Sequence, residues 1–168
     1  GEPLSDGVTV PILGPASAAP AKPFQPPLRP GWTTPCVGSV SLPLTYCPDL
    51  APPLAAWGAL LNGTLYLKDA GRLRIKESDR LAATADGLSR LGAQVEERPD
   101  GLILRGRARL RGGRVSGCQD HRIVMSMAVA ALMCEEPVEI TSAESVQKSW
   151  PSFFADYQRI GGDVHVVD

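Results

Sequence analysis

The chain has 168 residues, of which 43% are hydrophobic, and a formal net charge of −1 at pH 7. This length suits one domain, with or without a short arm, and is sufficient to bury a hydrophobic core. The near-neutral charge and the lack of any long apolar run or signal-peptide pattern predict a cytoplasmic protein with no nucleic-acid and no membrane partner.

Prolines crowd the N-terminal part of the chain and set it apart from the rest. They stand at positions 3, 11, 15, 20, 23, 26, 27, 30, 35 and 43. Such a composition is typical of an extended or irregular segment. We therefore predict an arm over residues 1–38, with one short strand at Val8-Thr9-Val10. An edge strand should follow, because Val40, Leu42 and Leu44 alternate with polar residues and Pro43.

From residue 46 onward the hydrophobic pattern predicts regular elements. In chain order they are a helix over 49–61, a strand over 64–68, a helix over 77–91, strands over 94–98 and 102–105, a helix over 121–134, a strand over 138–141, a helix over 149–160 and a strand over 164–167. Helix 49–61 tolerates Pro52 and Pro53 because they fall in its first turn. Helix 121–134 is apolar over most of its surface, so we expect it to be buried.

This order of elements occurs twice. Each copy places an acidic residue at the start of its first helix and a lysine at the start of its second helix. Asp49 and Lys76 are 27 positions apart, and Asp120 and Lys148 are 28 apart. We interpret this as a duplicated unit of mixed α/β type. The predicted domain covers residues 39–168, with units at about 46–110 and 111–168.

The charges of the segment Arg74-Ile75-Lys76-Glu77-Ser78-Asp79-Arg80 stand at the predicted start of a helix. On a helix, Lys76 and Arg80 are four apart and Glu77 and Arg80 are three apart, so they share a face. Each charge by itself is best explained as a solvated surface residue. Cations at a helix N-terminus oppose the helix dipole unless an anion offsets them. Such cations recur at Lys76, Arg80, Arg122 and Lys148. Together they therefore favour a site for one anionic ligand.

The aspartates and the histidine of this pattern have two interpretations each. An aspartate near a helix start is a preferred N-cap, worth about 1 kcal/mol. We interpret Asp120 first as a cap, and Asp49 either as a cap or as a base directed at a hydroxyl group. His121 is either a structural histidine or a neighbour of the ligand. Glu77 can deliver a proton to carbon only if its ion pairing changes when the ligand binds.

Two further patterns are better explained without a function. Arginines alternate at positions 105, 107, 109, 111 and 114, as in some nucleic-acid-binding strands, but no aromatic residues are interleaved. We expect solvated arginines on an exposed strand or loop. The four cysteines form no C-x-x-C pair and show no histidine spacing of a zinc site. We therefore predict no metal and no cofactor.

Four motifs resemble the family of 5-enolpyruvylshikimate-3-phosphate (EPSP) synthase. They are Cys47-Pro48-Asp49, the segment from Arg74 to Arg80, Asp120-His121-Arg122, and Lys148-Ser149-Trp150-Pro151. The resemblance runs from about Cys47 to Gly162 with the motifs in order. It implies repeated βαβαββ units of the enolpyruvyl transferase inverse-barrel type, about two of them in this chain. The Lys-Glu-Ser-Asp-Arg motif disfavours the related UDP-sugar transferase and RNA phosphate cyclase families.

The resemblance also implies an activity. The family transfers the enolpyruvyl group of phosphoenolpyruvate to the 5-hydroxyl of shikimate 3-phosphate and releases phosphate. Asp49 would contact that hydroxyl as the base, Lys76 would contact the shikimate ligand, and Glu77 would exchange a proton with the enol carbon. The residues that would hold phosphoenolpyruvate are Arg80, His121, Arg122 and Lys148.

The chain departs from the family pattern in two respects. Family members usually have an asparagine four residues before the motif lysine, where this chain has Arg72. The chain is also less than half of the family's length and lacks the motifs of the N-terminal half. We therefore expect a fragment that is inactive alone and needs that half in cis or in trans. The alternative is a non-catalytic anion-binding module derived from the same fold.

Overall fold

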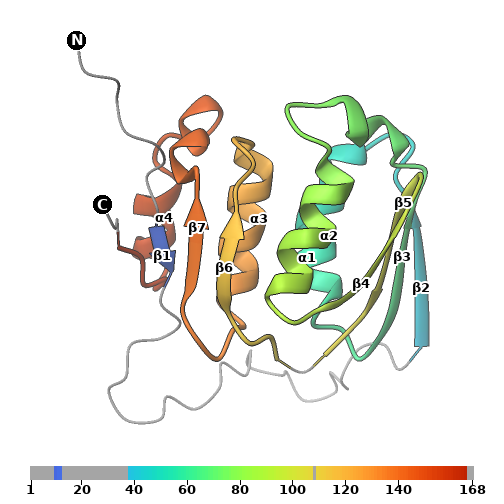
Figure 1. Cartoon of the computed structure of the whole chain (residues 1–168), viewed down its shortest axis with the longest axis horizontal. Helices are drawn as coiled ribbons and strands as arrows, with labels where there is room; N and C mark the ends of the chain where they lie inside the picture. The colour runs from blue at the N-terminus through green and yellow to red at the C-terminus, as the bar shows by residue number, and fades with distance from the viewer. Residues whose placement is uncertain (1–9, 13–37, 108, 166–168) are drawn as a thin grey trace.

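The computed structural model describes residues 10–12, 38–107 and 109–165, which form two sheets with helices between them (Figure 1). The larger sheet has the order β2-β3-β5-β4, with strands β2 (Gly38–Pro43), β3 (Gly63–Lys68), β4 (Gln94–Arg98) and β5 (Gly101–Arg105). The smaller sheet has the order β1-β7-β6, with strands β1 (Val10–Ile12), β6 (Gly113–Ser116) and β7 (Val138–Thr141). The mixed α/β class predicted from the sequence is confirmed.

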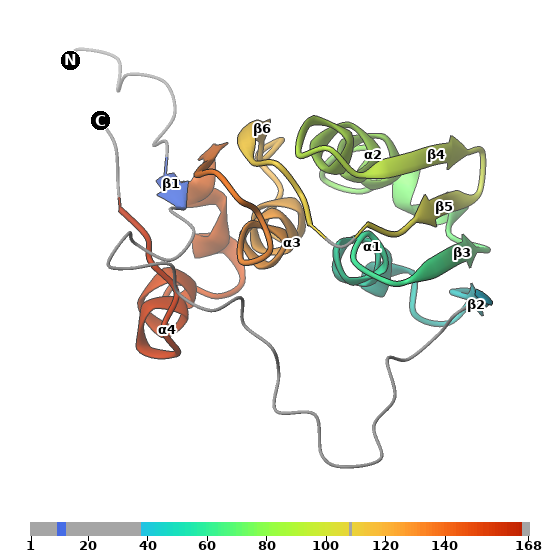
Figure 2. The same ribbon diagram turned by 90° about the horizontal axis from the view of Figure 1, so that it is seen from below.

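Three of the four helices pack against one another between the two sheets (Figure 2). The α-helices are α1 (Ala51–Gly58), α2 (Arg80–Arg90), α3 (His121–Ala131) and α4 (Phe153–Arg159). Three short 3-10 helices precede α1, α2 and α4, respectively: η1 (Pro48–Leu50), η2 (Gly71–Ile75) and η3 (Ala143–Lys148). Helix α3 is buried along most of its length, as its apolar composition predicts.

Two crossovers of the same kind organise the chain. Strand β2 pairs in parallel with β3 through α1, and β6 pairs in parallel with β7 through α3. Directly after the second strand of each crossover, one non-glycine residue adopts the left-handed conformation, Asp69 with φ 58° and Ser142 with φ 56°. A 3-10 helix follows in both cases. The two crossovers therefore bring the N-terminal ends of α1 and α3 to the same end of the molecule (Figure 1).

One face of the larger sheet is apolar and packs against the helices. Leu65 and Leu67 of β3 lie beside Leu104 and Leu102 of β5, and all four side chains are at most 2% exposed. This alternation is what a half-buried strand requires. The predicted strands at 64–68, 94–98, 102–105 and 138–141 are confirmed to within one residue. The edge position predicted for the strand around Val40 is confirmed as well.

Helix α2 begins at Arg80 and not at residue 77, because Asp79 occupies the N-cap position. The Asp79 side chain accepts a hydrogen bond from the backbone N–H of Ala82 at 3.0 Å. Lys76 has extended backbone, with φ −94° and ψ −158°. The predicted placement of Lys76, Glu77 and Arg80 on one face of a helix is therefore wrong.

Helix α4 begins at Phe153 and not at residue 149. Lys148 is the last residue of η3, so the prediction that it opens a helix is also wrong. Proline disfavours helical backbone at the residue before it. Pro151 therefore delays the helix beyond Trp150.

Other boundaries also differ from the prediction, and the helix expected over 121–134 ends at Ala131. The helix expected over 49–61 is divided into η1 and the shorter α1. The arginine-rich segment is not one strand, because β5 ends at Arg105 and β6, which was not predicted, begins at Gly113. Within the last predicted strand, Val164 and His165 are not in a strand, and 166–167 lie outside the described residues.

The N-terminal arm lies almost wholly outside the described residues. Its one described element, β1, pairs antiparallel with β7 and begins at Val10, whereas the strand was predicted at Val8-Thr9-Val10. In the part of the chain that the structure describes, no helix has the length and apolarity needed to cross a membrane.

The turn between β4 and β5 yields a first prediction. A Cβ atom added at Gly101 would collide with the backbone carbonyl oxygen of Leu67, which cannot rotate away. We expect Gly101→Ala to lower the free energy of unfolding by about 1–3 kcal/mol in urea denaturation. At Gly71 the added atom would lie 3.7 Å from its nearest neighbour, an ordinary contact. A loss as large in the control Gly71→Ala would contradict the steric explanation.

Candidate active site

The predicted site residues gather where the N-terminal ends of α1, α2 and α3 meet. Asp49 lies in η1 just before α1, and Arg80 is the first residue of α2. Asp120 is the N-cap residue of α3, and Arg122 lies in its first turn. Residues more than 70 positions apart in the chain are thus brought into contact.

Arg80 is the centre of this cluster and is only 2% exposed. Its Nε donates to Asp120 Oδ2 at 2.7 Å, and its Nη1 donates to Asp49 Oδ1 at 2.8 Å. Its Nη2 donates to Glu77 Oε2 at 2.6 Å and to Asp120 Oδ1 at 3.2 Å. One guanidinium group therefore holds three carboxylates.

Asp120 is fully buried and accepts four hydrogen bonds. Besides the two from Arg80, they come from Ser78 Oγ at 3.0 Å and from the backbone N–H of Arg122 at 2.9 Å. The last bond confirms Asp120 as a helix cap. Burial by itself would raise the pKa of Asp120, but the hydrogen bonds from Arg80 and Arg122 outweigh it and keep this pKa below its ordinary value.

Asp49 connects the buried part of the cluster with its exposed part. Its Oδ2 lies 3.4 Å from Arg122 Nη2, while its Oδ1 accepts from Arg80. The side chains of Asp49 and Arg122 are 38% and 37% exposed. Asp49 lies inside η1 and contacts these arginines, so of its two interpretations the helix cap is excluded.

Three other predicted residues lie around this cluster. His121 Nδ1 is buried, 4.0 Å from Asp120 Oδ1, and has no hydrogen-bond partner among the described residues. Lys148 Nζ donates to the backbone carbonyl of Gln119 at 3.0 Å, directly before the α3 cap. Lys76 is exposed, and within the described chain it makes no ion pair or side-chain hydrogen bond.

Arg80, whose guanidinium already donates four hydrogen bonds, can bind an anion only by exchange. Arg80 and Arg122 already hold Asp49 and Glu77, and those two carboxylates lie on the solvent-accessible side. Guanidinium groups bind carboxylate and phosphate in the same geometry. An anion that binds Arg80 would therefore have to displace these carboxylates. In residues 10–12, 38–107 and 109–165, no group of three His, Cys, Asp or Glu side chains could hold a metal ion.

Several contacts of the cluster were not predicted. The sequence pattern gave no sign that Arg80 would be buried, nor that Ser78 and Asp120 would hydrogen-bond across 42 positions. Asp79 was detectable, because an aspartate directly before an apolar periodic run is a helix-start signal. Applied to Ser78-Asp79, that signal would have placed the helix start at Arg80.

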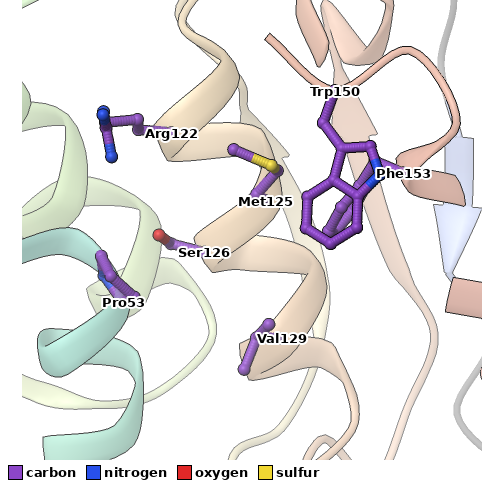
Figure 3. A pocket seen from close by; sticks show the side chains of 7 residues that line it. All are labelled: Pro53, Arg122, Met125, Ser126, Val129, Trp150 and Phe153. Carbon is purple, nitrogen blue, oxygen red and sulfur yellow. The ribbon is translucent and has the colours of Figure 1, made fainter. Parts of the chain in front are cut away.

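An apolar groove of about 210 Å³ lies beside the cluster (Figure 3). Its floor is the outer face of α3, and its walls come from α1 and from the segment leading into α4; it is lined by Pro53, Arg122, Met125, Ser126, Val129, Trp150 and Phe153. Arg122 stands at one end and points away from Trp150. The groove offers few polar partners, so it does not suit a phosphorylated ligand.

Comparison with known proteins gives a consistent result. The family model described as EPSP synthase (3-phosphoshikimate 1-carboxyvinyltransferase) matches residues 39–157. A 3-phosphoshikimate 1-carboxyvinyltransferase of Clostridium acetobutylicum is 52% identical over 119 residues, which are 71% of this chain and 28% of the relative. The same enzyme of Methanocella arvoryzae is 48% identical over 119 residues, with the same coverage of 71% and 28%.

Solved structures agree with the sequence comparison. The 2.37 Å structure of EPSP synthase from Acinetobacter baumannii is similar with a TM-score of 0.73 and 31% sequence identity. The similarity covers 78% of this chain and 32% of that chain. This chain therefore spans less than a third of the length of these relatives.

The buried pair of Arg80 and Asp120 yields a stability prediction. Asp120→Asn keeps an acceptor for the cap but leaves the Arg80 charge without its fully buried partner. We expect the free energy of unfolding, measured by urea denaturation, to fall by about 3 kcal/mol. The control is Asp86→Asn, which removes the exposed partner of Arg90 and should cost at most about 1 kcal/mol. Equal losses of unfolding free energy in the two variants would show that the buried Asp120–Arg80 pair stabilises the fold no more than an exposed pair does.

The carboxylates of Asp120 and Asp79 predict that the folded state loses stability in acid. The folded state lowers the pKa values of Asp120 and Asp79 below the unfolded value of 3.8. Their contribution is thus complete above about pH 4 and is lost as pH falls through the folded-state pKa values. Urea denaturation at pH 6 and pH 3 should show a smaller acid loss in Asp120→Asn than in the wild type. An identical loss would show that Asp120 is not a source of the acid sensitivity.

Proposed function

The chain belongs to the EPSP synthase family, and on this basis we propose that it forms part of an enolpyruvyl transferase. The proposed reaction moves the enolpyruvyl group of phosphoenolpyruvate to the 5-hydroxyl of shikimate 3-phosphate and releases phosphate. The observation that carries the proposal is the contact of one carboxylate, Asp49, with both Arg80 and Arg122 beside Glu77. The carboxylates proposed for acid–base chemistry thus lie in contact with the arginines proposed for anion binding.

Phosphoenolpyruvate carries a carboxylate and a phosphate, and we assign both to the cations around the start of α3. Arg122 is partly exposed and follows the N-cap of that helix, where unpaired N–H groups favour an anion. Lys148 and His121 lie beside the same helix end. Arg80 would also bind the ligand, with the N–H groups that become available when Glu77 and Asp49 move away.

We assign the shikimate ligand to Asp49 and Lys76. Asp49 would take the proton of the attacking 5-hydroxyl, because it is a partly exposed carboxylate beside the proposed phosphoenolpyruvate site. Lys76 is exposed and unpaired among the described residues, so its ammonium is free to contact a bound substrate.

Glu77 is the proposed proton donor and acceptor at the enol carbon. Protonating the methylene builds positive character at the neighbouring carbon, which the hydroxyl oxygen attacks; the same residue takes a proton back as phosphate leaves. Glu77 Oε2 pairs with Arg80 Nη2 at 2.6 Å. A bound anion that draws on Arg80 would weaken that pair and release the Glu77 side chain to face the substrate.

We further propose that each crossover belongs to one of two βαβαββ units, predicted at about 46–110 and 111–168, in a domain that begins near residue 39. Because the first crossover begins with β2 (Gly38–Pro43), the first unit would start at that strand. Their matching order and the left-handed residues Asp69 and Ser142 at equivalent points support this division. Because the chain spans 28% of its curated relatives, the remaining polypeptide would supply the rest of the site. Alone, the chain should show little turnover, since catalysis requires both substrates to be positioned together.

Reconstitution tests this function. Mixing the chain with the missing part of a relative should restore phosphate release from phosphoenolpyruvate and shikimate 3-phosphate. No release from a demonstrably assembled mixture would overturn the proposal. Calorimetry separates the alternative of a non-catalytic anion-binding module, for which phosphoenolpyruvate, shikimate 3-phosphate and sulfate would bind equally weakly.

A substitution at Glu77 tests its role in the assembled enzyme. Glu77→Gln keeps the size of the side chain and removes the proton-transfer group, so kcat should fall by about 10²–10⁴-fold while KM changes little. Glu136→Gln is the control, because Glu136 is exposed and follows α3 at the end opposite the cluster. Near-normal kcat in Glu77→Gln would remove this residue from proton transfer.

A further inference from the structure

The segment that carries Lys76 and Glu77 has no regular secondary structure. Residues 76–78 form bends between η2 and α2. A proton donor has to be held in place to act on one atom of a substrate. Contacts with neighbouring elements must therefore hold this segment in place.

Arg74 fixes the segment on its N-terminal side with four contacts. Its Nε donates to the carbonyl oxygen of Pro99 at 2.9 Å, and its Nη2 donates to that of Arg98 at 2.7 Å. Its Nη1 lies 2.8 Å from Asp79 Oδ2 and 2.8 Å from Glu97 Oε1. Arg74 thus ties η2 both to the turn between β4 and β5 and to the start of α2.

Asp79 fixes the segment on its C-terminal side with both carboxylate oxygens. One oxygen caps α2 through the N–H of Ala82, and the other pairs with Arg74. Burial would raise the pKa of Asp79, but the bonds from Ala82 and Arg74 outweigh it and lower the pKa. The Arg74–Asp79 pair closes a loop in which Ile75, Lys76 and Glu77 are exposed and Ser78 is half-buried.

We infer that Arg74 and Asp79 are positioning residues that hold the Lys76–Glu77 segment against Arg80. Ser78, which donates to Asp120 at 3.0 Å, is a third fixed point within the same segment. The backbone around Glu77 is thereby held on both sides, and its side chain remains free to exchange partners. The effect on catalysis rests on the proposed function of Glu77, whereas the effect on the segment does not.

The chain contains a matched control for this clamp. Arg90 Nε pairs with Asp86 at 2.7 Å, a distance close to that of the clamp, at the other end of α2. That pair is exposed, with side-chain exposures of 59% and 55%, against 28% and 38% for Arg74 and Asp79. Arg90→Gln therefore removes an arginine–aspartate pair of the same kind without touching the segment.

Amide hydrogen exchange tests the clamp without any ligand. In Arg74→Gln we expect the amides of residues 76–79 to exchange about tenfold faster, with exchange in α3 unchanged. In Arg90→Gln the same amides should keep their wild-type rates. Unchanged exchange of residues 76–79 in Arg74→Gln would overturn the inference.

A second variant separates the clamp from helix capping. Asp79→Asn keeps an oxygen that can accept from Ala82, so α2 should remain intact by circular dichroism. It removes the charge that pairs with Arg74, so residues 76–79 should again exchange faster. Exchange at the wild-type rate would show that the ion pair does not hold the segment.

A double-mutant cycle in the assembled enzyme tests the consequence for catalysis. Arg74→Gln should lower kcat by about tenfold or more with KM within about twofold, and it should cause no further loss when Glu77 is already glutamine. A merely structural role would give the same loss in both backgrounds and would overturn the positioning role. If the assembled wild type shows no turnover, the proposed function fails, and the exchange experiment still decides whether the clamp exists.

Discussion

The pairing of Arg80 with Asp120 is the interaction on which the rest of the site depends. Placing a guanidinium and a carboxylate in the interior removes both from water, and this is tolerated only when their hydrogen-bonding atoms are satisfied. Asp120 accepts four hydrogen bonds, and Arg80 donates four, two of them shared. Because Arg80 is the first residue of α2 and Asp120 is the N-cap residue of α3, this pair fixes the ends of the two helices relative to each other.

The charged groups of the cluster differ in how deeply they are buried. Arg80 and Asp120 are inaccessible, whereas Asp49, Glu77 and Arg122 reach the surface at one side. Charges at the surface can exchange partners at little cost, while those in the interior cannot. The buried pair thus anchors the more exposed charged groups, and the Arg74–Asp79 clamp anchors the backbone of the segment between η2 and α2.

Local signals in the sequence were sufficient for most elements but not for the contacts between them. The strands around Leu65 and Leu102 followed from alternation, and the buried helix α3 followed from its composition. The starts of α2 and α4 were missed because Asp79 and Pro151 outweighed the helical periodicity of neighbouring residues. Which residues share the site was predicted from spacing and family motifs. The burial of Arg80 depends on contacts across 40 positions, which no local pattern records.

The carboxylates of Asp49 and Glu77 pair with the arginines of the cluster, and this pairing has a consequence for selectivity. A small ion such as chloride offers one charge and no fork of oxygens, so it is a poor substitute for two carboxylates already in place. A guest with separate acidic groups can replace both at once. In the proposed function, the cluster would therefore select a ligand by the number and spacing of its negative charges.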